Sequence, residues 1–255
     1  MSVLQIEPTP TPRPGVAERL TWILDSFVDG PEVMFLEDIT EATGLPRSTA
    51  FRLITQLVDL GWLEHSVCGY RLGPRVLALS AQAQTHATLR SAASDTLHDL
   101  HETTGAVAHL GVLEGGRVHY LDKIGGALRN SIPVTGVGKR IAADRGVSGR
   151  VLLAGLSPEQ VDVLLAQENR SHRLPTLHQQ LDAARRRHGI VQSPAQTCPM
   201  GINAVAAPIL SPGGAIGAIG VASRRHLRLD ALAPQVARAA RQISLAMFPG
   251  WTGRR

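Results

Sequence analysis

The sequence holds only two cysteines, Cys68 and Cys198, which lie far apart and lack the short spacing of metal-binding pairs. This scarcity excludes a disulfide-stapled extracellular scaffold and predicts a reducing, cytoplasmic location. No apolar run reaches the roughly 18 residues that a membrane helix requires, so we expect no membrane partner. Four Phe, three Trp and two Tyr are present among 255 residues, so the cores must rest on Ala, Val, Leu and Ile.

The first residues, MSVLQIEPTPTPRPG, lack the charged start and the apolar stretch of a secretory signal. Their four prolines favour an extended, unpacked chain. Residues 1–14 are therefore predicted to be a short disordered tail.

The formal net charge of +5 is unevenly distributed. Residues 15–83 carry five arginines and nine acids, a net charge of −4, whereas the positive excess lies downstream. Bulk charge therefore does not locate a nucleic-acid-binding module, and the placement of individual cations must do so.

Residues 15–73 show the pattern of a winged helix-turn-helix. Apolar residues recur at helical spacing over 16–28, and LEDITEAT forms a second short helix that ends at Gly44. A third helix begins near Pro46 and runs to about Leu60. WLEHS and GYRL then read as two short strands of a hairpin, which would form the wing.

The third helix would bury one face and expose small polar and cationic side chains on the other. Arginine can bond a guanine in bidentate fashion, and Ser and Thr fit base edges or phosphates. The alternative is an ordinary surface helix with a capped N-terminus. The exposed residues are Arg47, Ser48, Thr49, Arg52, Thr55 and Gln56.

The rest of the chain is predicted to be a linker helix over 74–84 and an α+β domain over 85–250. A long helix ends at Gly105, and two strands flank Gly115-Gly116. SIPVT at 131–135 is a candidate third strand, two apolar strands flank SPGG, and a helix closes the chain over 230–247. Such a domain has the size and the apolar sheet of a ligand-binding module.

Motifs of catalysis and of metal binding are incomplete. GVSGR at 146–150 resembles the G-x-S-x-G nucleophile elbow, but Arg150 replaces the last glycine. His98 and His101 stand three residues apart on a helix with no evident third ligand. We therefore predict no catalytic residue, no metal and no cofactor.

The chain resembles the isocitrate-lyase-regulator (IclR) family of bacterial transcription regulators. The resemblance rests on TGLPRSTAFRLITQLVDLGWLEH and YRLGPRVLALS in the first domain, and on GVSGRVLLAGLSPEQ, LDAARRRHGI and GINAVAAPILSPGGAIGAIGVAS in the second. It implies a winged helix-turn-helix, a linker helix and a GAF-like effector-binding domain. It also implies dimers, often paired into tetramers, on palindromic double-stranded operators.

By this resemblance, the DNA-binding residues lie on the third helix and on the wing, and an effector pocket lies against the sheet, beneath the loop that precedes the helix starting near Gly149. The helix residues are Arg47, Ser48, Thr49, Phe51, Arg52 and Thr55, and the wing residues are Tyr70 and Arg71. The pocket residues are Val147, Ser148, Ile202, Ala204, Gly220 and Ala222. The chain departs from the family pattern at 141–145 and at 193–196, so the resemblance does not carry over the identity of the effector.

The resulting expectation is a non-enzymatic, effector-responsive regulator, a repressor or an activator, of a catabolic operon. Cations near the expected pocket mouth favour an organic acid as effector; they are Lys139, Arg140, Arg145 and Arg150. The rival reading is a small-molecule sensor or an enzyme whose winged helix mediates protein contacts.

Overall fold

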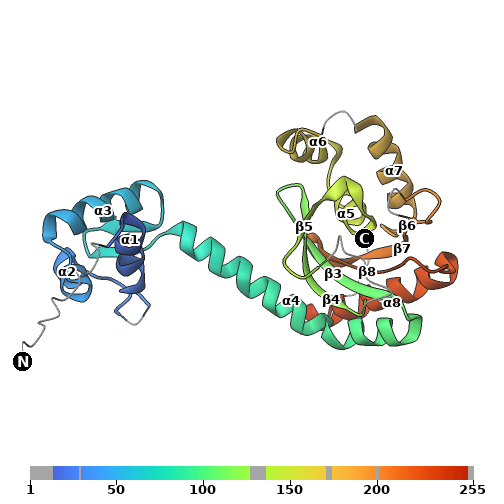
Figure 1. Cartoon of the computed structure of the whole chain (residues 1–255), viewed down its shortest axis with the longest axis horizontal. Coiled ribbons are helices and arrows are strands. Elements are labelled where there is room, and N and C mark those ends of the chain that lie inside the picture. Colours follow the sequence, from blue (N-terminus) through green and yellow to red (C-terminus); the bar gives the residue numbers. More distant parts are fainter. Residues whose placement is uncertain (1–13, 29, 127–135, 171–173, 199–200, 252–255) are drawn as a thin grey trace, which may run out of the picture. The chain divides into compact units, whose positions relative to one another are not determined.

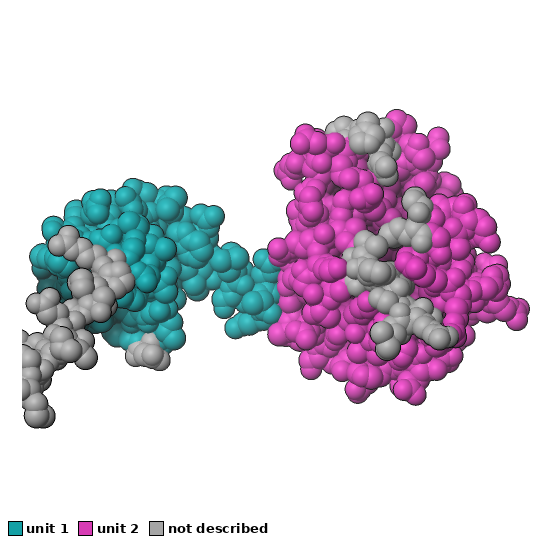
Figure 2. Space-filling model, viewed as in Figure 1, with its two compact units in different colours: residues 1–84 teal, residues 85–255 magenta. Residues whose placement is uncertain are grey.

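The computed structural model describes residues 14–28, 30–126, 136–170, 174–198 and 201–251. Packing divides the chain into two compact units, residues 1–84 and 85–255 (Figure 2). Each unit has its own hydrophobic core. The predicted tail at 1–14 falls almost entirely outside the described residues. Within the described ranges, no helix is both long and apolar enough to cross a membrane.

The described part of the first unit folds into three helices and a two-stranded antiparallel sheet (Figure 1). These elements are α1 (Val16–Asp25), α2 (Leu36–Thr43), α3 (Arg47–Asp59), β1 (Leu63–Ser66) and β2 (Gly69–Leu72). Helix α2 ends at Gly44, whose φ of 66° lies in the left-handed region that glycine adopts without strain. The order of α2, turn, α3 and hairpin is that of a winged helix-turn-helix.

The core of this unit is made by one face of each helix. Its largest fully buried side chains are Ile23, Ile39, Leu53, Ile54 and Leu63. Burial of these apolar side chains away from water stabilises the packing of the helices. The unit is small, so this core is the main source of its stability.

Helix α4 (Pro74–Thr104) is one continuous helix of 31 residues. The sequence-based prediction of a linker helix over 74–84 followed by a separate helix was wrong in this respect. No Gly or Pro occurs between Arg75 and Thr104 to interrupt the helix. Its apolar stripe is confined to the later turns, where the buried residues are Leu89, Ala93, Leu97 and Leu100.

The second unit contains a six-stranded antiparallel sheet with the strand order β5-β4-β3-β8-β7-β6. The strands are β3 (Val107–Glu114), β4 (Arg117–Ile124), β5 (Arg140–Ala142), β6 (Val191–Ser193), β7 (Asn203–Ser211) and β8 (Gly214–Ser223). Both β5 and β6 are three residues long, and β5 was not predicted. The predicted strand at 131–135 lies outside the described residues.

Helices cover both faces of this sheet (Figure 1). They are α5 (Val147–Ala154), α6 (Pro158–Gln167), α7 (Leu174–Arg186) and α8 (Leu229–Met247), with a 3-10 turn η1 (Ala143–Arg145) before α5. Helix α8 and the later turns of α4 pack on one face, and α5, α6 and α7 pack on the other. Side chains that alternate along the strands therefore enter two different cores.

Candidate functional site

The outer side of α3 presents a polar, cationic surface. Ala50, Leu53, Ile54 and Leu57 are buried against the rest of the unit. The intervening positions stay in solvent: Arg47, Ser48, Phe51, Arg52 and Thr55 are exposed, and Thr49 is half-buried. The Phe51 side chain is 53% exposed and adds an apolar group to this polar surface.

Two of the predicted arginines are held by carboxylates. Arg47 on α3 forms an ion pair with Glu37 on α2, and the hydrogen bond from Arg47 is the main cause that lowers the pKa of Glu37. Arg71 bonds Glu64 across the hairpin, with Nη2–Oε2 at 2.6 Å. Both pairs are exposed, so a phosphate can displace the carboxylate at little cost. Arg52 has no ion pair among the described residues, which leaves its guanidinium available for a new partner.

The two predicted contact residues of the wing, Arg71 and Tyr70, differ in their exposure to solvent. Arg71 is exposed on β2. Tyr70 is half-buried, and its ring stacks on His65 with centroids 4.4 Å apart. The Tyr70 backbone also bonds Met34 in both directions, at 2.8 and 2.9 Å. Tyr70 therefore anchors the wing to the core and offers less surface than Arg71.

A cavity of about 60 Å³ lies in the second unit, between the start of α5 and the strands β7 and β8. All six residues assigned to the effector pocket from the sequence line it: Val147, Ser148, Ile202, Ala204, Gly220 and Ala222. Two of its polar residues, His109 and Tyr120, were missed by sequence reasoning, whereas Ser193 lies in the stretch 193–196 where the sequence departs from the family pattern. His109 and Tyr120 lie close together because β3 and β4 are neighbours in the sheet, and Ser193 on β6 is paired with the lining residue Ala204 on β7.

Two polar groups of the cavity, those of His109 and Tyr120, are strongly desolvated. His109 is 4% exposed, and its burial, together with the charge of Lys123, lowers the pKa to about 3. Burial raises the pKa of Tyr120, which is hydrogen-bonded with Ser148. At neutral pH the cavity therefore presents a neutral imidazole and the hydroxyl groups of Tyr120, Ser148 and Ser193, which can donate or accept hydrogen bonds.

Two of the four cations expected at the pocket mouth line this cavity. They are Arg145 and Arg150, whereas Lys139 and Arg140 are not among its described lining residues. Burial lowers the pKa of Arg150, although Cys198 and Asp144 oppose the shift. Its Nη1 donates to Gln180 Oε1 at 3.1 Å, and its Nε is buried with no hydrogen-bond partner among the described residues. A buried guanidinium N–H without an acceptor is costly, and an anionic ligand would satisfy it.

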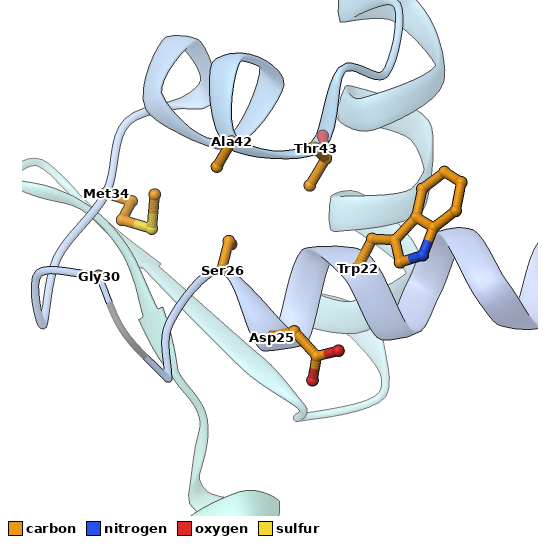
Figure 3. Close-up of a pocket in the computed structure, with 7 residues that line it drawn as sticks. All are labelled: Trp22, Asp25, Ser26, Gly30, Met34, Ala42 and Thr43. Carbon is orange, nitrogen blue, oxygen red and sulfur yellow. The ribbon is translucent and has the colours of Figure 1, made fainter.

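A second depression, of about 610 Å³, lies on the first unit between α1 and α2 (Figure 3). Figure 3 shows Ser26, Met34 and Ala42 around it, with the Trp22 indole at one end. Among the described residues that line it, Asp25 is the one that carries a charge. None of the residues predicted to bind DNA or an effector lines this depression.

We expect the free energy of unfolding to fall as pH is lowered from about 6.5 toward about 3, because of His109. The folded state holds this imidazole neutral, whereas the unfolded state binds a proton below about pH 6.5. The unfolded state then binds more protons, so stability is lost as pH falls, by up to about 1.4 kcal/mol per pH unit.

Urea unfolding near pH 6 and pH 5 measures this slope in the wild type and in His109→Gln. The His98→Gln variant serves as the control, because His98 is an exposed histidine on α4 of the same unit. Equal slopes in His109→Gln and the wild type would contradict the assignment.

Comparisons with known proteins agree with this architecture. The profile of the bacterial transcriptional regulator IclR C-terminal domain matches residues 81–245, and that of the IclR helix-turn-helix domain matches residues 16–66. The regulator XynR of Escherichia coli is 30% identical over 58% of this chain and 59% of its own length. The probable regulator SauR of Cupriavidus necator is 31% identical over 76% of this chain and 78% of its own length.

The alignments with the curated relatives XynR of E. coli and TtgV of Pseudomonas putida span about three fifths of the length of those proteins. Solved structures show the same fold over most of the chain. An IclR homologue of Microbacterium hydrocarbonoxydans, complexed with 4-hydroxybenzoate, has a TM-score of 0.58 at 24% identity and covers 91% of this chain and 99% of its own. IclR of Thermotoga maritima has a TM-score of 0.55 at 21% identity, over 89% of this chain and 96% of its own.

The matched domains and relatives are transcriptional regulators, not enzymes. Two profiles in the family's order cover most of the sequence, and the winged helix-turn-helix and the sheet domain occupy the matched ranges. The chain belongs to the IclR family of bacterial transcriptional regulators.

Proposed function

We propose that this chain is a DNA-binding transcription regulator whose second unit senses a small organic acid. The observation that carries the proposal is the outer side of α3, where Arg52 and the short polar residues stand exposed beside an apolar core. The IclR regulators to which the chain is similar support its proposed role as a transcription regulator. The location expected for such a regulator is the cytoplasm.

The proposed DNA complex places α3 in the major groove. Arg52 would bond base edges, Phe51 would contact a thymine methyl group, and Arg47 and Arg71 would exchange their carboxylate partners for phosphates. A homodimer, or a pair of dimers, would place two such helices about 34–36 Å apart on a palindromic operator.

The proposed effector site is the cavity beside α5, in a domain of GAF-like type. Its volume of about 60 Å³ is below the roughly 300 Å³ of ordinary ligand sites, so a ligand would have to displace lining side chains. The buried Nε of Arg150 favours a carboxylate there, and the 4-hydroxybenzoate bound by the M. hydrocarbonoxydans homologue is a ligand of that class. Such a ligand would favour one of two conformations of the regulator and so change its affinity for DNA.

The rival is a sensor whose winged helix binds another protein, and the net charge of −4 over residues 15–83 is its support. The arrangement of charge argues against it. Most of these acids lie outside α3, which carries Arg47 and Arg52. Phosphate binding depends on such local cations and not on the total charge of the domain.

We expect Arg52→Ala to weaken operator binding by about 1–3 kcal/mol, or about 5- to 150-fold. The full-length protein is first footprinted on the intergenic DNA beside its own gene, which supplies the operator. The affinity of each variant is then measured on that DNA by gel shift at several salt concentrations, because lost phosphate contacts also reduce the salt dependence.

The matched control is Arg241→Ala, which removes an exposed arginine from α8 of the second unit and the same amount of charge. Its affinity should equal that of the wild type. Equal affinities for Arg52→Ala and Arg241→Ala would remove the base-contact role of Arg52. If the protein protects no DNA from cleavage even at low salt, the result would favour the alternative in which the winged helix binds another protein.

A further inference from the structure

Two histidines and a glutamate converge on the second unit, on the sheet face opposite the cavity. His119 on β4 is paired with Val112 on β3, and Glu114 lies two residues farther along β3, so both side chains share the Val112 face. Val112 belongs to the core beneath α4 and α8. His86 stands on α4 one turn before the buried Leu89. Three elements thus bring these side chains to one place.

The distances between the three side chains are short. Glu114 Oε1 is 3.1 Å from His119 Nδ1 and 3.6 Å from His86 Nε2. All three ligand atoms lie within 4.8 Å of one another. Ligands of a tetrahedral zinc ion are about 3.4 Å apart, as bonds of about 2.1 Å require. Small side-chain rotations therefore bring all three atoms onto one ion.

The surroundings also suit a metal. The three side chains are 19%, 15% and 20% exposed, which shields the cluster while leaving a route for an ion. Arg140 holds the other carboxylate oxygen, Oε2 of Glu114, with Nη2 at 2.7 Å and Nε at 2.9 Å. This contact directs Oε1 of the carboxylate toward the histidines, as outer partners of metal ligands do.

We propose that His86, Glu114 and His119 form a binding site for a divalent transition-metal ion, of which zinc is the best fit. Two imidazoles and one carboxylate are a ligand set that zinc takes with its fourth position open to water or to another ligand. Magnesium and calcium prefer sites built from oxygen alone, so they fit this set poorly.

Occupation of the site would join α4 to the β3–β4 hairpin. Helix α4 begins in the first unit and contributes His86 just after the boundary at residues 84 and 85. A metal would then fix this part of α4 on the sheet, independently of any ligand in the cavity. The proposal does not rest on DNA binding and can fail or succeed separately from it.

The test is a titration of the untagged, full-length protein with zinc chloride after EDTA treatment. We expect calorimetry to show one zinc per chain at this site, and zinc to raise the Tm because it binds the folded state. His86→Gln and His119→Gln should each weaken zinc binding at least about tenfold, since even an outer partner of a zinc ligand contributes about 10- to 100-fold. Both replaced side chains are partly exposed, and circular dichroism checks that each variant is folded.

The matched control is His98→Gln, on the same helix as His86 but outside the cluster. It should bind zinc like the wild type, and magnesium chloride should leave the Tm unchanged. Cobalt in place of zinc provides a second readout, because its visible absorption reports a low-coordinate nitrogen and oxygen site and should disappear in both cluster variants. Zinc affinity that persists in His119→Gln and His86→Gln, or the lack of saturable binding by the wild type, would overturn the proposal.

Discussion

The Gly149→Ala variant is expected to lose about 3 kcal/mol or more of the free energy of unfolding of the second unit. A Cβ atom at Gly149 would lie 2.0 Å from the carbonyl oxygen of Ala143 and 2.5 Å from its carbonyl carbon. Both are backbone atoms of η1 and cannot rotate away. Relief requires a shift of α5, whose next residues, Val151 to Ala154, are buried in the core. Overpacking of this kind is among the larger effects of a single methyl group.

Hydrogen exchange of peptides from β7 and β8 measures this loss, because it reports the second unit separately from the first. The control is Gly213→Ala in the turn between these strands, where an added Cβ would meet only Ser211 Oγ, at 3.8 Å. Protection in the control should match that of the wild type. Wild-type protection in Gly149→Ala would show that η1 and α5 can separate without cost.

The role of Gly149 illustrates what the sequence could not reveal. From the sequence alone, the stretch GVSGR is comparable only to an incomplete nucleophile elbow. In the structure, this glycine allows the first turn of α5 to approach the carbonyl group of Ala143. The need for that approach depends on how η1 turns into α5, and no periodicity of the sequence encodes it.

Elements with strong local signals were predicted closely. Helix α2 occupies LEDITEAT, and the strands β3 and β4 flank Gly115-Gly116, because capping residues and turn glycines act within a few positions. The strand β5 was missed because three residues are too few to show alternation. The unbroken α4 was missed for another reason: Leu77 and Leu79 are exposed, so no apolar stripe connects its two halves.

The candidate sites likewise differ in how much of each could be predicted from local sequence. The outer side of α3 follows from its own periodicity, since the buried and exposed residues alternate with the helical turn. His109 joins the cavity through the pairing of β3 with β8, which is distant in sequence, and Tyr120 lies on the neighbouring strand β4. One signal was nevertheless present: His109 stands among apolar residues of β3, where a polar side chain needs a partner. The partners of His86 were hidden, because the strands that carry Glu114 and His119 reach it only in the folded unit.

Arg150→Ala is expected to weaken the binding of a carboxylate ligand about 30-fold or more. The proposed carboxylate would accept from the buried Nε of Arg150, for which the described part of the chain provides no acceptor. Loss of the guanidinium would leave that carboxylate desolvated and unpaired, at a cost of about 2 kcal/mol or more. Arg150→Lys should bind with intermediate affinity, because an ammonium keeps the charge but not the planar N–H pair.

Calorimetry with a panel of small carboxylates, beginning with 4-hydroxybenzoate, measures this difference against the corresponding neutral amides. The wild type should prefer a carboxylate to its amide, and Arg150→Ala should lose that preference while Arg241→Ala keeps it. If the preference for the carboxylate over its amide depends on Arg150, this guanidinium recognises the charge of the ligand. The apolar lining residues would then select the ligand by its shape. Tight binding of neutral compounds alone, with no response to any carboxylate, would instead make Arg150 a structural partner of Gln180 and would remove the organic-acid assignment.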